Sequence, residues 1–115
     1  MKYLKNESRY KDCRNISILS IDINLGNIKT SRSFLKIMNE KLNFPSYFGF
    51  NYNALDECMQ DLSWISEEKI VINFKYINRL REKNQVLYNE VYDCLSMYEK
   101  YWEKNEKDKK VVINF

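Results

Sequence analysis

The 115-residue sequence contains no histidine, and this absence removes several of the commonest catalytic and metal sites. Ser-His and Cys-His nucleophile arrangements need an imidazole base, and mixed Cys/His zinc sites need imidazole ligands. Neither the G-x-G-x-x-G nor the G-x-x-x-x-G-K-[ST] phosphate loop occurs, because the first needs three glycines and the two glycines of the chain, Gly26 and Gly49, are too far apart for the second. We therefore expect no enzyme: no catalytic residue, no metal site and no bound cofactor.

Cysteines and long apolar runs are also scarce. Cys13, Cys58 and Cys94 are odd in number and widely spaced, which suits reduced thiols better than a disulfide framework. No stretch approaches the length of a membrane span, and the N-terminus has no apolar run long enough for the core of a signal peptide. These features predict a cytoplasmic protein with no membrane partner.

The composition that remains is that of one globular domain. Hydrophobic residues make up 44% of the chain and aromatic residues 15%, enough to build a single core at this length. Residues 1–14 are polar and mixed in charge. We expect residues 1–14 to form a loose polar extension and residues 15–115 to form the domain.

Short apolar runs alternate with segments of helical periodicity, which predicts an α/β fold. The Ile-rich residues 16–25 end at a Gly-Asn turn signal and predict a first strand. Apolar residues at three- and four-residue spacing then predict a helix from Thr30 or Ser31 to about Asn43, and a second helix begins after Asn51, a good N-cap.

Two later segments, 69–75 and 110–115, share the sequence Ile-Asn-Phe and predict short buried strands. Residues 76–109 between them are enough for a right-handed crossover through one helix or two. Continuous apolar runs are typical of a parallel sheet covered on both sides. We predict the order β-α-α-β-α-β, a single three-stranded parallel sheet packed by helices, with the two Ile-Asn-Phe strands adjacent.

The predicted second helix has two different faces. Leu55, Cys58, Met59 and Leu62 recur at i, i+3, i+4 and i+7 and form an apolar stripe for the core. We expect the polar residues to point outward from the opposite face; they are Asn53, Asp56, Glu57, Gln60 and Asp61.

Charge is distributed unevenly along the chain. The formal net charge is +3, but residues 42–68 contain five acids and no Lys or Arg, a net charge of −5. The rest of the chain carries 19 basic and 11 acidic residues, a net charge of +8. The acidic island is either a solvated face or a site for a basic partner.

The island includes the segment FPSYFGFNYNALDECMQDLSW, residues 44–64, which resembles the most recognisable segment of the barstar family. In that family a P-x-Y-F/Y-G-x-N loop leads into a helix reading D-A-L-x-D-C-L. The residues that stand at matching positions are Pro45, Tyr47, Phe48, Gly49, Asn51, Ala54, Leu55 and Cys58. The order of strands and helices agrees over about residues 16–115.

The resemblance implies an inhibitor of the immunity-protein type that blocks the active site of a partner toxin. In the family, the loop and the exposed helix face plug the active site of a ribonuclease, with carboxylates in place of substrate phosphates. Glu57 stands at the position of the family's principal carboxylate, with Asp56 beside it and Asp61 one turn later. The partner-binding residues that we expect are Tyr47, Gly49, Asn51, Tyr52, Asn53, Asp56, Glu57, Gln60 and Asp61. The partner is then a basic protein, and we expect the free chain to be a monomer.

The chain departs from the family pattern in two places. Asn53 replaces the first carboxylate of the helix, and Glu57 lengthens the main one from Asp. A further acid that the family supplies from a later helix has three possible counterparts, Glu90, Asp93 and Glu99.

Two other functions compete with inhibition, and several residues of the segment also have a purely structural explanation. Asn53 favours a non-inhibitory protein-protein interaction domain with the same fold. Nucleic-acid binding would use the basic remainder of the chain, but the lysines form no dense tract and no RNA-binding signature is present, so we do not expect it. For the apolar residues of the segment, among them Cys58, packing in the core is sufficient explanation. Gly49 can serve the loop either by a positive φ or by allowing close backbone approach.

Overall fold

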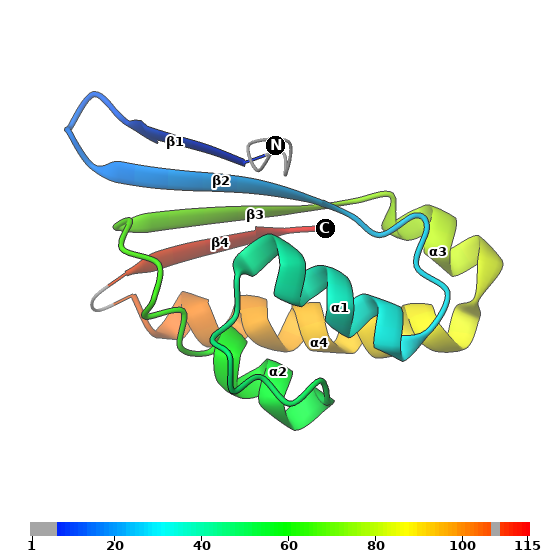
Figure 1. The fold of residues 1–115 in the computed structure, drawn as a ribbon. Helices are drawn as coiled ribbons and strands as arrows, with labels where there is room; N and C mark the ends of the chain where they lie inside the picture. The colour runs from blue at the N-terminus through cyan, green and yellow to red at the C-terminus, as the bar shows by residue number, and fades with distance from the viewer. Residues whose placement is uncertain (1–6, 107–108) are drawn as a thin grey trace.

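The computed structural model describes residues 7–106 and 109–115 as an α/β domain (Figure 1). The elements follow one another in the order β1 (Glu7–Lys11), β2 (Ser17–Asn24), α1 (Ser31–Leu42), α2 (Tyr52–Met59), β3 (Lys69–Lys75), α3 (Ile77–Lys83), α4 (Gln85–Lys104) and β4 (Lys110–Asn114). The strands form one sheet in the order β1-β2-β3-β4. Strands β2, β3 and β4 are parallel, and β1 is antiparallel to β2.

The predicted α/β class is confirmed, but the prediction of three strands, all parallel, was wrong. The fourth strand, β1, comes from the segment that we expected to be a loose extension, and its Tyr10 lies opposite Ile18 of β2. Residues 1–6 of that extension lie outside the described residues. Strand β1 reads ESRYK and has no alternating apolar residues, because it forms the edge of the sheet and most of it is exposed to solvent.

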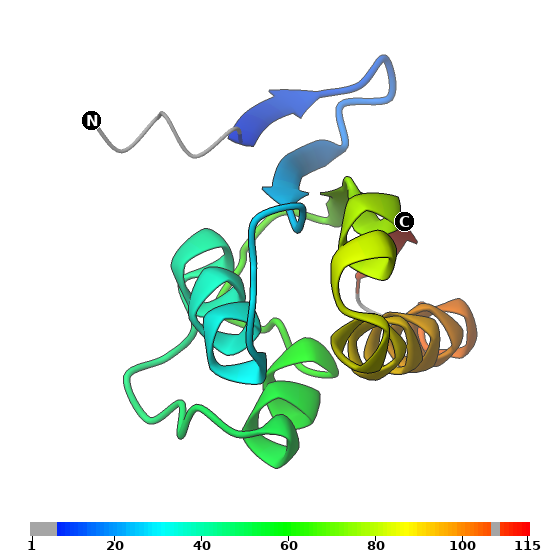
Figure 2. The ribbon, with the colours of Figure 1, turned by 90° about the vertical axis from the view of Figure 1, so that its right-hand side faces the viewer.

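The two Ile-Asn-Phe strands are adjacent and parallel, as predicted, with Asn73 opposite Asn114. The expectation that helices cover both faces of the sheet was wrong. Helices α1, α2 and α4 lie on one side, and α3 lies beyond the carboxyl ends of β2 and β3 (Figures 1 and 2). Residues on the helix-covered face, such as Ile21 and Ile72, are buried, whereas their neighbours on the other face are half-exposed.

A row of polar side chains crosses the face that no helix covers. The Asn73 side-chain amide donates to Asp22 Oδ1 at 3.0 Å, and the Asn114 amide donates to Asn73 Oδ1 at 2.8 Å. Asp22, Asn73 and Asn114 are direct neighbours in the strand register. This row satisfies polar groups across three strands and makes the uncovered face compatible with water.

Helix α1 begins with a reciprocal pair of hydrogen bonds. The Thr30 hydroxyl accepts from the Ser33 backbone N–H at 3.1 Å, and the Ser33 hydroxyl accepts from the Thr30 N–H at 3.0 Å. The helix ends at Asn43, which has a left-handed conformation. Both ends agree with the predicted helix. The Thr30 side chain pairs with a free backbone N–H at the N-terminus, and Asn43 takes the left-handed conformation that ends many helices.

Two tryptophans attach α2 and the segment after it to the rest of the domain. Trp102 of α4 donates its indole N–H to the carbonyl of Met59 at 2.7 Å, and Trp64 donates to the carbonyl of Leu42 at 2.9 Å. Burial of Leu55, Cys58 and Met59 fixes which face of α2 meets the core. Within the described part of the chain, no helix is both long and apolar enough to cross a membrane.

Candidate protein-binding surface

The start of α2 is fixed by Asn51. Its side-chain oxygen accepts from the Ala54 backbone N–H at 2.8 Å, and its extended backbone, with φ −139° and ψ 168°, is that of an N-cap. Asn51 is exposed, but this hydrogen bond occupies its oxygen. Its role in the loop is therefore to orient α2, as predicted from the sequence, and a contact with a partner would be additional.

Three candidate residues lie along the outer side of α2 at a spacing of four. Asn53, Glu57 and Asp61 are exposed, and Asp61 lies just beyond the last residue of the helix. Side chains four residues apart lie above one another on a helix, so Asn53 and Glu57 share one face of α2, and Asp61 follows in the turn after the C-cap. Glu57 makes no ion pair or hydrogen bond with any described side chain, and Asp61 accepts from the Ser63 hydroxyl at 3.1 Å.

Asp56 does not point outward, and that prediction was wrong. Its Oδ1 accepts from the hydroxyl of Tyr98 in α4 at 2.6 Å, and Asp56 is half-buried between the two helices. Burial, followed by the bond to Asp56, raises the pKa of the Tyr98 phenol far above its usual value. The phenol therefore stays protonated and donates a hydrogen bond to Asp56, which makes Asp56 a structural carboxylate.

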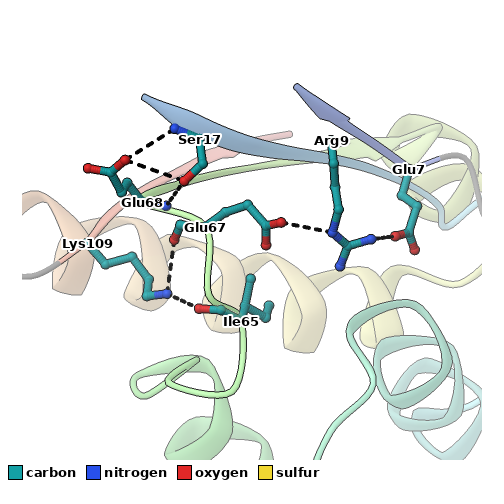
Figure 3. Close-up of polar contacts among 7 residues, drawn as sticks. All are labelled: Glu7, Arg9, Ser17, Ile65, Glu67, Glu68 and Lys109. Atoms are coloured by element: carbon teal, nitrogen blue, oxygen red, sulfur yellow. Dashed lines mark hydrogen bonds and ion pairs between the residues drawn. The ribbon is translucent and has the colours of Figure 1, made fainter. Parts of the chain in front are cut away.

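The acidic island of the sequence does not form one surface. Glu67 accepts from Arg9 Nε of β1 at 2.9 Å, and the same guanidinium is paired with Glu7 (Figure 3). Glu68 accepts from the Ser17 backbone N–H at 3.3 Å, while its own N–H donates to the Ser17 hydroxyl at 3.0 Å. Glu67 and Glu68 thus connect the segment just before β3 to β1 and β2. They lie at this junction and do not contribute to the surface of α2.

Lys109 reinforces the same junction. Its ammonium donates to the carbonyls of Ile65 and Glu67, the latter at 3.1 Å (Figure 3). Burial lowers the pKa of Lys109, and the carboxylates of Glu67 and Asp61 act against that shift.

Of the five acids in the island, Asp56, Glu67 and Glu68 are bound internally, and Glu57 and Asp61 are the two that remain exposed on the α2 side.

A third carboxylate, Glu90 of α4, contacts α2 directly. Its Oε1 accepts from the Tyr52 hydroxyl at 2.8 Å and from the Ser31 hydroxyl at 2.9 Å. Burial raises the pKa of Tyr52 to about 12, and Glu90 contributes in the same direction, so the phenol is a proton donor at neutral pH. Of the three acids considered from the sequence, the structure brings Glu90 to α2, whereas no described hydrogen bond joins Asp93 or Glu99 to that helix.

The loop before α2 presents one aromatic side chain to solvent and packs another. Tyr47 is 73% exposed, whereas Phe48 is buried and packs its ring at a tilt against those of Phe44 and Phe50. Gly49 does not have a positive φ; the left-handed residue is Phe50, with φ 52°. A Cβ on Gly49 would lie 3.2 Å from the Asn51 side-chain nitrogen, so the glycine leaves room for the side chain of the N-cap rather than for a backbone segment, as had been predicted.

The nine predicted residues fall into a structural group and an exposed group. Gln60 is half-buried at the C-cap of α2. Asn51, Tyr52 and Asp56 use their polar atoms inside the protein. We define the α2 surface as the exposed candidates Tyr47, Gly49, Asn53, Glu57 and Asp61. Phe50, which is 37% exposed, adjoins it and was not predicted, although its place in the loop was the available signal.

A reactive or metal-binding arrangement would have to come from Cys58 or from the acids of this surface. Cys58 beneath it is buried, and burial together with Asp61 and Glu57 raises the pKa of its thiol, which disfavours a nucleophilic thiolate. Among the described residues no three Cys, Asp or Glu side chains are grouped so that they could hold a metal ion. An exposed aromatic ring in the loop and two exposed carboxylates that form no ion pair with the described residues suit the recognition of a basic protein surface.

Comparison with known protein families matches residues 18–114 to the barstar family, described as the barnase inhibitor. The search of curated proteins found no match. The family match runs from β2 to β4 and leaves β1 outside it. Because the match covers most of the sequence and includes the whole α2 surface, the chain belongs to the barstar family.

Proposed function

We propose that the protein is an inhibitor of the immunity type, which binds a ribonuclease toxin and covers its active site with the α2 surface. The family to which the chain belongs is described as an inhibitor of barnase, and this description supports a ribonuclease as the partner. On this proposal the protein is not an enzyme and acts as a monomer in the cytoplasm.

The observation that carries the proposal is that Glu57 is exposed and has no hydrogen-bond or ion-pair partner among the described residues. A carboxylate that is exposed and without an internal partner is available to Arg or Lys of another protein, whereas Asp56, Glu67 and Glu68 are occupied. A ribonuclease active site holds cations for the phosphates of RNA. Glu57 and Asp61, four residues apart, would meet these cations from one side of α2, with Tyr47 adding apolar contact.

The alternative is a protein-binding domain of the same fold that inhibits nothing. Asn53 favours it, because an amide keeps the shape of the family carboxylate at this position but removes a charge. The two functions share a surface and differ in the nature of the partner.

The test is affinity capture from a lysate of the native host with three baits: wild type, Glu57→Lys and Glu103→Lys. Glu103 is an exposed acid on α4, so Glu103→Lys is a control with the same change in net charge. Reversing a charge at an interfacial ion pair costs about 3 kcal/mol or more, so Glu57→Lys should bind about a hundredfold more weakly.

We expect wild type and Glu103→Lys to retain a ribonuclease and abolish its activity, and Glu57→Lys to lose it without a change in melting temperature. Recovery of the same non-hydrolytic protein by wild type and the control would support the alternative. Equal recovery of a ribonuclease by all three baits would remove the α2 surface from the proposal.

A further inference from the structure

A second charged surface lies at the carboxyl ends of β2 and β3, away from the acids of α2. Segments 24–36 and 75–83 meet there and contain seven basic residues and one acid, Glu82, a net charge of +6. All seven are exposed; they are Lys29, Arg32, Lys36, Lys75, Arg79, Arg81 and Lys83. Figure 2 looks onto this end of the molecule, which we call the basic end. The two segments are far apart in sequence, which is why the lysines form no dense tract.

The charge of the basic end is hardly neutralised by the protein itself. Lys75 lies 3.9 Å from Asp22, and the other six residues form no ion pair within the described residues. The first turns of α1 and α4, which begin at this end, contain no acid. Glu90 of α4, which accepts from the Ser31 hydroxyl, is a further acid near segment 24–36. Six exposed cations that form no ion pair with the described residues still create a positive potential that attracts anionic ligands.

The basic end is hollowed rather than flat. A cavity of about 660 Å³ lies between the start of α1 and the junction of α3 and α4, lined by Asn27, Ile28, Lys29, Lys83 and Asn84. Its two walls are joined where the Asn84 side chain donates to the carbonyl of Lys29 at 3.4 Å. In open α/β sheets, ligands bind outside the carboxyl ends of the strands, which is where this cavity lies.

A planar aromatic side chain lies beside these cations. Tyr76 is 54% exposed, and the guanidinium of Arg79 lies 4.8 Å from the centre of its ring. The pair packs against the turn at Gly26, where a Cβ would lie 3.1 Å from Tyr76 Cβ and 3.2 Å from Arg79 Cδ, so the glycine makes room for both side chains. Aromatic rings and arginine planes are the surfaces on which the bases of single-stranded nucleic acids stack.

We propose that the basic end binds single-stranded nucleic acid. Lys29, Arg79 and Lys83 contact phosphates, and Tyr76 with Arg79 provides a stacking platform for a base. The amides of Asn27 and Asn84 at the cavity offer donors and acceptors to base edges. An acidic protein would use the cations but would have no need of a stacking platform, so the combination favours a nucleic acid.

The test uses the purified protein and a fluorescein-labelled 12-residue oligouridine, with binding followed by fluorescence anisotropy. The variant K29Q/R79Q/K83Q removes three cations from the basic end. Its matched control, K11Q/K100Q/K104Q, removes three exposed lysines elsewhere and has the same net charge. Because the six residues are exposed, both variants should melt at the wild-type temperature.

We expect the basic-end variant to bind at least about tenfold more weakly and the control to stay within about twofold of wild type. Loss of three phosphate contacts should lower the slope of log K against log salt by about 2. Equal weakening of both variants would show attraction by net charge alone and overturn the proposal.

Tyr76→Leu tests the choice of ligand, since it keeps an apolar side chain but removes the aromatic ring. We expect it to weaken oligouridine binding about tenfold, the usual contribution of one stacked base. Unchanged affinity would mean that the basic end is a site for polyanions in general and would overturn the assignment to nucleic acid. Neither experiment involves a ribonuclease, so failure here would leave the function proposed for the α2 surface unaffected.

Discussion

Replacing Tyr98 by Phe removes one hydroxyl from the interface of α4 and α2 and leaves the packing of the ring unchanged. Tyr98 is fully buried, and its hydroxyl is 2.6 Å from Asp56 Oδ1. Hydrogen bonds to charged groups contribute about 1.5 to 3 kcal/mol to the free energy of unfolding. Asp56 is half-exposed and can recover a water molecule, so we expect a loss near the lower limit, about 1.5 kcal/mol.

For a domain of this size, a loss of about 1.5 kcal/mol lowers the melting temperature by about 6 °C. Urea unfolding followed by circular dichroism measures the free energy directly. Because the pKa of Tyr98 is raised in the folded protein, the phenol stabilises the fold fully below the pKa of an unfolded tyrosine and loses this contribution only as the pH rises through the folded value. The experiment at pH 7 therefore measures the complete effect.

Two further variants separate the structural carboxylate from the exposed one. Asp56→Ala leaves a buried hydroxyl without its acceptor and should cost about 2 kcal/mol, and adding Tyr98→Phe to it should recover part of that cost, because it removes the hydroxyl that was left unpaired. Glu57→Gln should leave the free energy of unfolding within about 0.5 kcal/mol of wild type. An unfolding midpoint of Tyr98→Phe equal to that of wild type would refute the assignment of Asp56 as a structural residue.

The remaining predictions concern the thiols and the start of α1. Burial raises the pKa of Cys94 to about 11, so at pH 8 a thiol reagent should modify exposed Cys13 rapidly and Cys94 only after unfolding. The protonated thiol of Cys94 stabilises the fold fully below the unfolded pKa, near 9, and this contribution is lost as the pH rises through about 11. Urea titrations at several pH values should show this loss in wild type and not in Cys94→Ala. Thr30→Ala removes one half of the reciprocal cap of α1 and should cost about 1 kcal/mol in thermal unfolding, whereas Ser46→Ala in an exposed loop should cost nothing measurable.

Helix α1, helix α2 and the parallel strands could be predicted because their signals are local. The cap at Thr30, the apolar stripe of α2 and the Ile-Asn-Phe strands each depend on residues within one element. Strand β1 has no such signal. Its charged and polar residues suit an edge that faces water, and they form a strand because β2 supplies the hydrogen-bonding partner.

The internal hydrogen bonds of Asp56, Glu67 and Glu68 could not be predicted from helical periodicity, for a similar reason. The spacing of α2 places Asp56 on the polar side, but only the position of Tyr98, 42 residues later, decides that this carboxylate is bound internally. Glu67 and Glu68 likewise find their partners in Arg9 and Ser17, which lie more than 50 residues before them. The count of five acids in residues 42–68 therefore overstated the acidity of the α2 surface. Glu57 was the acid of α2 whose exposure could be predicted from the periodicity of the helix itself.

The row of Asp22, Asn73 and Asn114 bears on how the sheet selects one arrangement among several. Strands β3 and β4 read KIVINF and KVVINF, so apolar packing alone hardly distinguishes them, and a slip by two residues would keep the same side chains facing the helices. A slip of β4 by two residues would place Asn73 opposite Val112 or Asn114 opposite Val71 and break the hydrogen bond between the two amides, at about 1 to 3 kcal/mol for a half-buried group left unpaired. Three polar residues on the uncovered face thus supply the alignment that the hydrophobic residues leave undetermined.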